Sequence, residues 1–414
     1  MPQIAAAETR VAASPQDQSI DSFYAARGGQ PLWLASGGNE PQILMHWLAS
    51  AGADGLSPDH DRLRMLDNAL SKLSHGNKRT ILQIDRLLTD AFVDYVRQVR
   101  RLKNAEMIWV DPALRPSAEF PRHLLDEAAA APSLKAYLGE MRWMNPIYVG
   151  LRQAILVGAD NRPLLALNLE RARALPAGRG RYVIVNASAA QLTMVEDGQV
   201  IDAMRVVVGK PVYPTPMMAA MIRYASLNPY WNVPPDLAAE RIAPNVVKDG
   251  KAYLKLKGYQ LLSSWDEDAT VVSPATVDWP AVAAGKQEVR IRQLPGSSNA
   301  MGRMKFMFPN AQGIYLHDTP DKALLGEETR MFSGGCVRLE DASRLARWLF
   351  NGKPPSPTSA TPEQRVDLPE PVPVFLTYLT AVPGEGGVAY LPDVYHRDQA
   401  AMAALASARA VASR

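Results

Sequence analysis

The sequence predicts an α+β protein in which an all-α N-terminal domain is followed by a mostly antiparallel β domain. Apolar residues recur every three or four positions between residues 19 and 138, which is the period of an amphipathic helix. Beyond Asn168 the pattern changes to short runs rich in β-branched residues, which is typical of strands. The 414 residues also exceed what one hydrophobic core usually organises, so at least two domains are expected.

Residues 43–48 and 81–96 carry the clearest helical pattern, and a turn at residues 54–58 separates two of the expected helices. A row of aromatic residues can stack on sugar rings, but aromatics at helical spacing more often fill a core. We therefore expect the aromatics of this part to be core residues: Phe23, Tyr24, Trp33 and Trp47.

In the second part, a turn at residues 196–199 joins two neighbouring runs, which indicates a meander. A short helix is expected to begin at Asp341. The last strand is expected to close the sheet. The expected strands are residues 182–186, 191–195, 203–208, 289–292, 305–308, 314–316 and 374–379.

The stretch from residue 210 to residue 285 is far longer than an ordinary loop and contains several prolines. Its many aromatic residues argue against disorder. We therefore expect an ordered flap over the functional cleft, with Tyr230 and Trp231 facing the substrate. The alternative is an insertion that only packs against the helical domain.

The remaining segments are defined by composition. The first residues are rich in Ala, Ser and Gln, residues 352–371 are proline-rich and form an exposed arm, and the end of the chain is rich in alanine. The end of the chain is expected either to fray or to return to the helical domain. The expected division is a flexible lead (1–18), a helical scaffold domain (19–165), a β domain (166–380) and a tail (381–414).

Composition excludes several classes of protein. Forty-five basic and forty-two acidic residues leave a net charge of +3, and no basic stretch is interleaved with aromatics, so no nucleic acid partner is expected. Six histidines and one cysteine show no ligand spacing, which argues against a metal site, and no cofactor is expected. No apolar run approaches the length needed to cross a membrane.

The single cysteine is the most informative residue. Cys336 follows two glycines, and His317 ends an expected strand upstream of it. A nucleophilic cysteine needs a base, small neighbours that let a carbonyl approach, and backbone N–H groups aimed at the oxyanion. A lone cysteine is also often a buried hydrophobe, and a lone histidine is often a hydrogen-bonding core residue. From the residues alone, both interpretations stay open.

The two segments around this pair resemble the catalytic signature of the YkuD-type L,D-transpeptidases. That signature reads H-[GD]-T and, fifteen to twenty residues later, S-x-G-C-[IV]-R, and the chain has His317-Asp318-Thr319 and residues 333–338. Further segments resemble the YcbB-like branch of the family. These are residues 168–171, 208–211, 215–216, 228–234 and 299–306. The resemblance implies the L,D-transpeptidase fold for the β domain.

Two features depart from that pattern. Many members carry histidine or serine where this chain has Gly334, so a side-chain role there is absent. The YcbB-like branch usually has an inserted peptidoglycan-binding module, and residues 140–165 are too few to hold one. Glycan anchoring by such a module is therefore not expected.

The resemblance implies acyl transfer through a thioester. Cys336 would attack the carbonyl of the third residue of a peptidoglycan stem peptide. His317, oriented by a backbone carbonyl near Asp318, would hold the thiolate and carry the proton. The backbone N–H groups of Gly335 and Cys336 would bind the oxyanion.

Four further residues are candidates for support. The hydroxyl of Tyr315 would add to the oxyanion site, and Arg338 would brace the cysteine loop or meet a substrate carboxylate. Ser333 and Asp318 are weaker candidates because short polar residues in turns often only satisfy backbone groups. For Tyr315 the alternative is packing within the strand, and for Arg338 it is a surface ion pair.

The resemblance also implies partners and a location. The partners would be donor and acceptor stem peptides, and β-lactams of the carbapenem class would be covalent inhibitors. The N-terminus lacks the basic and apolar regions of a secretion signal, so either the protein is cytoplasmic or its signal was removed. The resemblance favours a periplasmic protein whose signal peptide was removed. Two alternatives remain, a cysteine L,D-carboxypeptidase or peptidase that uses water as acceptor, and a noncatalytic wall-binding protein.

Overall fold

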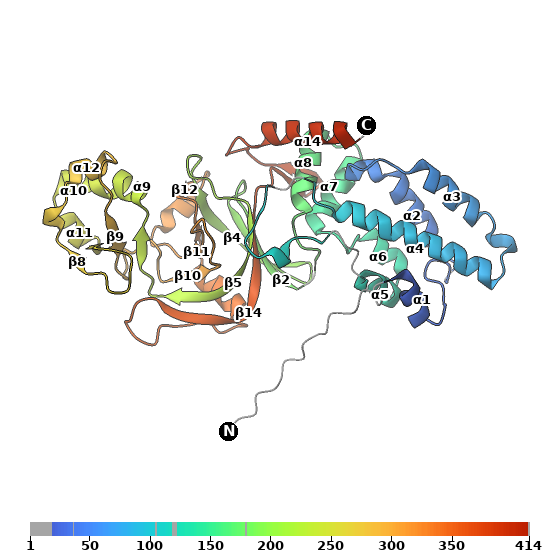
Figure 1. The fold of residues 1–414 in the computed structure, drawn as a ribbon, viewed down its shortest axis with the longest axis horizontal. Coiled ribbons are helices and arrows are strands. Elements are labelled where there is room, and N and C mark those ends of the chain that lie inside the picture. Colours follow the sequence, from blue (N-terminus) through green and yellow to red (C-terminus); the bar gives the residue numbers. More distant parts are fainter. Residues whose placement is uncertain (1–18, 36, 104–105, 118–121, 179, 413–414) are drawn as a thin grey trace, which may run out of the picture.

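The computed structural model describes residues 19–35, 37–103, 106–117, 122–178 and 180–412, so the expected flexible lead 1–18 lies outside the described residues. Figure 1 shows three lobes along the long axis, with helices at one end, a sheet in the middle and a small mixed lobe at the other end. Each lobe has its own hydrophobic core. The predicted combination of a helical domain and a mostly antiparallel β domain is confirmed.

The helical lobe is built around the long helix α4 (Lys78–Arg100), which begins where the Asn77 side chain accepts the N–H of Thr80. One face of α4 is apolar, and Leu88 and Phe92 from it are buried in the core with the aromatics that the sequence predicted there. The other helices are α1 (Ile20–Ala26), α2 (Glu40–Ala49), α3 (His60–Leu70), α5 (His123–Ala130), α6 (Leu134–Gly139), α7 (Pro146–Leu156) and α8 (Arg162–Ala172).

Helix α8 ties this lobe to the end of the sheet. The amide of Asn168 accepts the Thr380 N–H at 2.8 Å, and Arg171 forms a buried ion pair with Asp398 at 2.7 Å. Leu165 and Leu169 of the same helix lie in the helical core. The Asn-Leu-Glu-Arg segment is therefore a structural connection, and the expected boundary at residue 165/166 falls inside α8.

The central sheet is closed by its last strand, as predicted. Its order is β5-β10-β11-β13-β4-β3-β2-β14, and β14 also pairs with β5, so the sheet has no free edge along this path. Two pairs in the ring are parallel, β11 with β13 and β2 with β14. The strands are β2 (Arg181–Asn186), β3 (Gln191–Glu196), β4 (Gln199–Gly209), β5 (Met218–Leu227), β10 (Met304–Met307), β11 (Leu316–His317), β13 (Val337–Leu339) and β14 (Gln364–Thr377).

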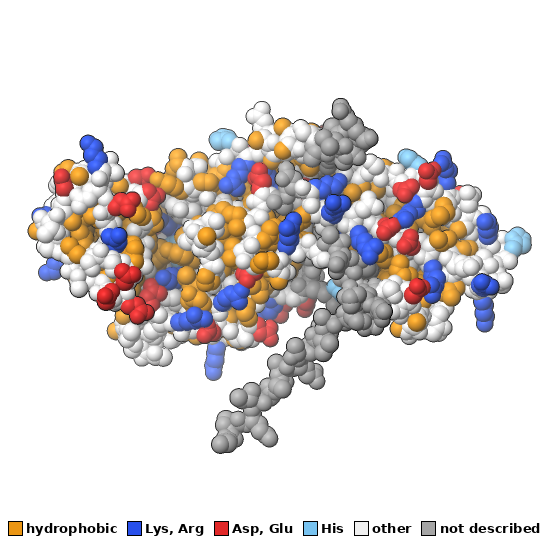
Figure 2. All heavy atoms as spheres, in the orientation of Figure 1, with side chains coloured by type: hydrophobic (Ala, Val, Ile, Leu, Met, Phe, Trp, Pro, Cys, Tyr) orange, Lys and Arg blue, Asp and Glu red, His pale blue; other side chains and the backbone are white. Residues whose placement is uncertain are grey.

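Smaller elements complete the central lobe. β1 (Ile108–Trp109) pairs with β5, β12 (Met331–Ser333) pairs with β4, and α13 (Ala342–Leu349) begins where Asp341 accepts the Arg344 N–H. The helix predicted to begin at Asp341 is thus present. Figure 2 shows positive and negative side chains interspersed on the visible face, in keeping with the small net charge.

The flap was predicted with the wrong bounds at its N-terminal side. Residues 218–227 form β5, a buried strand of the central sheet between β10 and β14. Alanines and methionines in this run favour helix over strand, so local propensity concealed it. The strand predicted at residues 289–292 exists as β9 (Arg290–Gln293), but it belongs to the small lobe and not to the central sheet.

The small lobe is a four-stranded sheet covered by short helices. The sheet order is β6-β9-β7-β8, and the core includes Val233, Ile242 and Trp279. We call this lobe the subdomain. Its elements are β6 (Trp231–Val233), α9 (Pro235–Leu237), the π-helix Ala238–Ile242, α10 (Ala243–Asp249), α11 (Ala252–Leu256), β7 (Tyr259–Leu262), β8 (Val271–Val272), α12 (Trp279–Ala283) and β9.

The proline-rich arm, predicted as residues 352–371, also needs correction because its second half is strand. β14 begins at Gln364 and contains Pro369 and Pro371. The pairing with β5 shifts register between Asp367 and Val372. Proline has no N–H to donate to a ladder, and this irregularity is where a strand tolerates it.

The tail packs on the helical lobe. The hairpin of β15 (Ala381–Gly384) and β16 (Gly387–Tyr390) lies against α7, and the Tyr390 hydroxyl donates to the Asp160 carbonyl at 2.7 Å. Helix α14 (Asp398–Ala412) runs beside α8 in Figure 1. Of the two expectations for the tail, the structure shows the one in which it packs back onto the helical lobe.

Candidate active site

The two sequence segments that carry chemistry meet on neighbouring strands. β11 and β13 pair in parallel, with Leu316 opposite Val337 and His317 opposite Arg338, and the Val337 N–H donates to the Tyr315 carbonyl at 3.1 Å. This register puts Tyr315 level with Cys336, and it puts His317 opposite Arg338, two residues further along. The two segments that the sequence singled out thus lie on neighbouring strands.

His317 is held in one orientation. Only 1% of its surface is exposed, and its Nδ1 lies 2.6 Å from the Asp318 carbonyl oxygen. A carbonyl only accepts, so Nδ1 carries the hydrogen and Nε2 is left to take a proton. Burial lowers the pKa of His317 to about 3, and the positive charge of Arg338 acts in the same direction. The ring is therefore neutral in the resting protein.

Cys336 is half-buried, and its Sγ donates to the Gly313 carbonyl at 3.6 Å. Burial raises the pKa of the thiol to about 11 and outweighs the backbone N–H and hydroxyl of Tyr315, which favour the thiolate. Cys336 and His317 both lie in the described part of the chain, and no hydrogen bond joins their side chains. Burial favours the neutral form of each group, so the pKa shifts favour a neutral thiol and imidazole over the resting thiolate that the sequence analysis expected.

Ser333 organises the cysteine loop. Its hydroxyl donates to the Cys336 carbonyl and accepts the Gly335 N–H at 3.1 Å. Gly335 has φ +112°, and a Cβ there would lie 3.1 Å from Ile314 Cδ1, so no other residue fits. The Gly335 N–H, expected to bind the oxyanion, is thus engaged by Ser333, whereas the Cys336 N–H has no partner among the described residues.

Sequence reasoning missed Thr215. Its hydroxyl accepts the Gly209 N–H at 2.9 Å and donates to the Gly335 carbonyl at 2.8 Å, which links β4 to the cysteine loop. Thr215 is fully buried at 1% exposure. The family resemblance at residues 215–216 was the only available signal, and it did not indicate this role.

The subdomain reaches the cysteine loop through residues that the sequence did not single out. Leu237 Cδ1 would lie 3.2 Å from a Cβ at Gly334, so the glycine that departs from the family pattern makes room for this leucine. Arg241 donates from Nη2 to the Phe332 carbonyl at 3.2 Å. These contacts of Leu237 and Arg241 could be found only in the folded structure, because the residues are far from Cys336 in the sequence.

Tyr230 and Trp231, expected to face the substrate, have other contacts. The Tyr230 N–H donates to Glu363 at 2.8 Å and its ring lies 4.4 Å from the Arg292 guanidinium. The Trp231 ring packs near Tyr259 on the subdomain core. Within the described part of the chain, no contact joins either residue to Cys336.

Arg338 has an unusual environment. Its Nε is buried without a hydrogen-bond partner, and no carboxylate in the described ranges forms an ion pair with it. Burial lowers the pKa of Arg338, and the nearby charge of Arg241 lowers it further, with Asp321 acting in the opposite sense. The bracing contact expected of Arg338 is thus not present, and neither is the surface ion pair.

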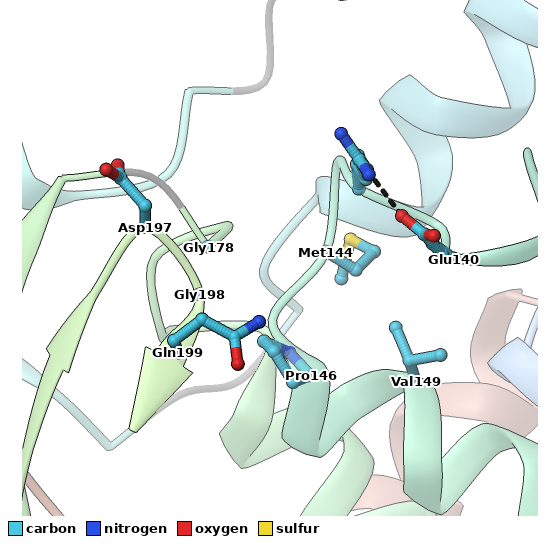
Figure 3. Close-up of a pocket in the computed structure, with 9 residues that line it drawn as sticks. Glu140, Met144, Pro146, Val149, Gly178, Asp197, Gly198 and Gln199 are labelled. Atoms are coloured by element: carbon cyan, nitrogen blue, oxygen red, sulfur yellow. Dashed lines mark hydrogen bonds and ion pairs between the residues drawn. The ribbon is translucent and has the colours of Figure 1, made fainter. Parts of the chain in front are cut away.

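A separate hollow has a lining that includes none of these residues. A hollow of about 680 Å³ separates the helical lobe from the turn between β3 and β4, and in Figure 3 Met144, Pro146 and Val149 face Gly198 and Gln199 across it. The Glu140–Arg142 ion pair lies at its edge. Its lining contains no group suited to acyl transfer.

Across the residues that the structure describes, no His, Cys, Asp and Glu cluster fits a metal ion, and no helix is long and apolar enough to cross a membrane.

Comparison with known proteins gives the class. Residues 180–359 match the model of the YkuD family, described as an L,D-transpeptidase catalytic domain, and residues 18–155 match a scaffold domain. The chain is 29% identical over 393 residues to a putative L,D-transpeptidase of Haemophilus influenzae, covering 91% of this chain and 77% of the relative. Residues 180–359 are thus similar to the L,D-transpeptidase catalytic domain of the YkuD family, and a match to a scaffold domain precedes them.

Two of the solved structures found to be similar to the chain are also named L,D-transpeptidases. One is an L,D-transpeptidase from Mycobacterium smegmatis, with 14% identity, a TM-score of 0.24, and coverage of 49% of this chain and 63% of that one. Another is L,D-transpeptidase 3 from Mycobacterium tuberculosis with a faropenem-derived adduct, with 14% identity, a TM-score of 0.24, and coverage of 50% and 65%. The chain spans less than two thirds of the length of either.

Proposed function

We propose that the protein cross-links peptidoglycan stem peptides by acyl transfer through a thioester on Cys336. One observation supports the proposal: β11, which ends in a buried and carbonyl-oriented His317, pairs with β13, which follows Cys336 directly, and both strands lie in the part of the chain similar to the L,D-transpeptidase domain. The reaction needs a nucleophile, a base and oxyanion donors, and all three lie within this short stretch of structure.

In the first half-reaction, the Cys336 sulfur attacks the carbonyl carbon of the third residue of the donor stem. His317 Nε2 takes the thiol proton as the sulfur–carbon bond forms. The tetrahedral intermediate then collapses, the bond to the terminal D-residue breaks, and His317 returns the proton to the leaving amine. The donor is now a thioester on Cys336.

In the second half-reaction, the amine of another stem attacks the thioester carbonyl. His317 takes a proton from this amine and gives it to the departing Cys336 sulfur, which restores the neutral pair. Starting from a neutral thiol and a neutral imidazole, each step moves one proton through one ring nitrogen. The protein therefore needs no cofactor for this chemistry.

The Cys336 N–H and the Tyr315 hydroxyl are the proposed oxyanion donors. The Cys336 N–H has no partner within the described ranges, whereas the Gly335 N–H is already bound by Ser333. The Tyr315 hydroxyl favours the thiolate form of Cys336, which supports a position near the atom where the oxyanion forms. Ser333 and Thr215 hold the loop in place, and Asp318 contributes only its carbonyl.

The subdomain is proposed to cover the donor side of the site and to govern access. Contacts of Leu237 and Arg241 with residues 332–334 support this role, whereas those of Tyr230 and Trp231 do not. Such a cover excludes water from the thioester, which favours an amine over water as acceptor. The carboxypeptidase alternative uses the same residues, and product analysis separates it from crosslinking.

The remaining expectations follow from the family. We place the protein in the periplasm, where stem peptides are found, and in the YcbB-like branch, whose helical scaffold corresponds to the matched scaffold domain. We also propose that carbapenems acylate Cys336, because their strained ring amide presents a carbonyl to the same thiol. Incubation of the purified protein with synthetic tetrapeptide stems tests the proposal: a crosslinked dimer supports it, and a free tripeptide alone would indicate the hydrolase.

A further inference from the structure

Two arginines from different lobes lie near the loop that carries Cys336, and neither forms an ion pair with a carboxylate among the described residues, although the charge of Asp321 favours the charged form of Arg338. Arg338 is on β13, two residues after Cys336, and its buried Nε has no hydrogen-bond partner in the described structure. Arg241 comes from the subdomain and reaches the carbonyl of Phe332, four residues before Cys336. The charges of the two guanidiniums also interact, since Arg241 lowers the pKa of Arg338.

A π-helix of the subdomain positions Arg241 against the strand that leads to Cys336. Arg241 lies on the π-helix Ala238–Ile242, and π-helical turns are rare and are often found at functional sites. The π-helix continues α9, which lies on the side of the subdomain that faces the central lobe in Figure 1. Leu237 of α9 fills the space over Gly334, so the subdomain approaches residues 332–334 closely at this point.

Unpaired, partly buried guanidiniums are costly, so such a pair is expected where an anion binds. The field at the loop is already positive. Arg338 and Lys305 both act to lower the pKa of the Cys336 thiol, and Lys305 is paired with Glu363 at 2.9 Å. Arg338 and Arg241 have no such partner, and a planar fork matches a carboxylate.

The donor offers a carboxylate at the required place. In a stem whose terminal D-residue is the leaving group, one Cα separates the scissile nitrogen from the terminal carboxylate. With bonds of about 1.5 Å, that carboxylate lies within roughly 4 Å of the carbonyl that Cys336 attacks. A donor positioned for attack must therefore place a negative charge beside the cysteine loop.

We propose that Arg241 and Arg338 together bind the terminal carboxylate of the donor stem, so that the subdomain supplies half of the site that selects the leaving residue. This inference rests on the proposed function. It makes Arg241 a specificity residue, and it gives the subdomain a role in recognition as well as in covering the site. Binding of the carboxylate draws the two lobes together over the thiol.

The first test compares donor tetrapeptides that end in a carboxylate with the same peptides ending in a carboxamide. Arg241→Gln is expected to lower kcat/KM about 10-fold for the carboxylate donor and to leave the carboxamide donor within about 2-fold, since a charged hydrogen bond is worth about 1.5–3 kcal/mol. Arg241→Lys should recover part of the loss. Arg290→Gln, an exposed arginine of the same subdomain, is the matched control and should change neither.

The second test does not depend on transpeptidation. Iodoacetate and iodoacetamide alkylate the same thiol and differ only in charge near the reacting carbon. Arg241→Gln and Arg338→Gln should lower the ratio of the iodoacetate rate to the iodoacetamide rate several-fold, and Arg290→Gln should leave it unchanged. This ratio cancels changes in thiol reactivity that affect both reagents.

The two tests together separate the possibilities. Equal losses with both donors in Arg241→Gln would mean a structural role and would overturn the proposal, as would an unchanged reagent ratio. A lowered ratio in a protein that processes no stem peptide would support the anion site while contradicting the proposed function. A lowered ratio with unchanged donor preference would overturn the assignment to the donor carboxylate.

Discussion

His317 and Arg338 lie opposite each other in the parallel pairing of β11 and β13, so the proposed base has a cation as its cross-strand neighbour. Burial and this charge together keep the imidazole neutral. Cys336 precedes Arg338 by two residues and is itself held as a neutral thiol by burial. The site is therefore set for proton transfer during attack and not for a preformed ion pair.

His317→Gln should slow acylation of Cys336 by a carbapenem about 10²- to 10⁴-fold, which is the usual contribution of a positioned base. Glutamine can still donate to the Asp318 carbonyl, so the loop is expected to keep its shape. Stopped-flow or mass-resolved acylation rates measure the loss. A rate near that of the parent, in a variant with unchanged circular dichroism, would place the base elsewhere.

The pH dependence of thiol alkylation follows from the raised pKa of Cys336. Because that pKa is about 11, the thiolate fraction should rise about tenfold per pH unit through pH 9. Iodoacetamide rates measured between pH 6 and pH 10 should therefore increase without a plateau. A plateau beginning near pH 7 would reveal a resting thiolate–imidazolium pair and would contradict the neutral state.

Gly334→Val should slow acylation because its side chain meets Leu237, whose Cδ1 already lies 3.2 Å from the Cβ position. Leu237→Ala in the same chain should restore much of the rate by opening that space. Gly326→Val is the control, since nothing lies within 4 Å of its Cβ position. Failure of the double variant to recover would show that Leu237 does not contact the loop in solution.

The subdomain should be removable without loss of the thiol. Its two ends meet, since the Asn299 side chain donates to the Pro229 carbonyl at 3.0 Å, so a short Gly-Ser link can replace residues 231–297. This variant is expected to lose use of stem-peptide donors but to keep its iodoacetamide rate within several-fold. Loss of both rates in a folded variant would make the subdomain part of the catalytic core, and loss of neither would make it dispensable.

Most of the fold could be predicted from periodicity, and the exceptions have a physical reason. The helical lobe and the strands with β-branched residues follow local pattern. β5 was missed because its alanines and methionines suit a helix, and it becomes a strand only through pairing with β10 and β14. Assignment of β9 to the subdomain depends on long-range pairing, which one sequence does not reveal.

At the site, the pair that carries the chemistry could be predicted because residue type and spacing are distinctive. The supporting contacts could not. Thr215, Leu237 and Arg241 reach the cysteine loop from residues about a hundred positions away, so only the folded chain brings them there. Tyr230 and Trp231 were singled out because they are aromatic, but that property suits them equally to packing in and around the subdomain.

The most direct test of the central claim is the intact mass of the protein after incubation with a carbapenem. Opening of the lactam ring loses no atoms, so the parent protein should gain the mass of one whole carbapenem, and peptide mapping should place it on Cys336. Cys336→Ala and Cys336→Ser should show no gain. An adduct of the same mass on either variant, or a parent protein that gains nothing, would contradict the assignment of Cys336 as the nucleophile.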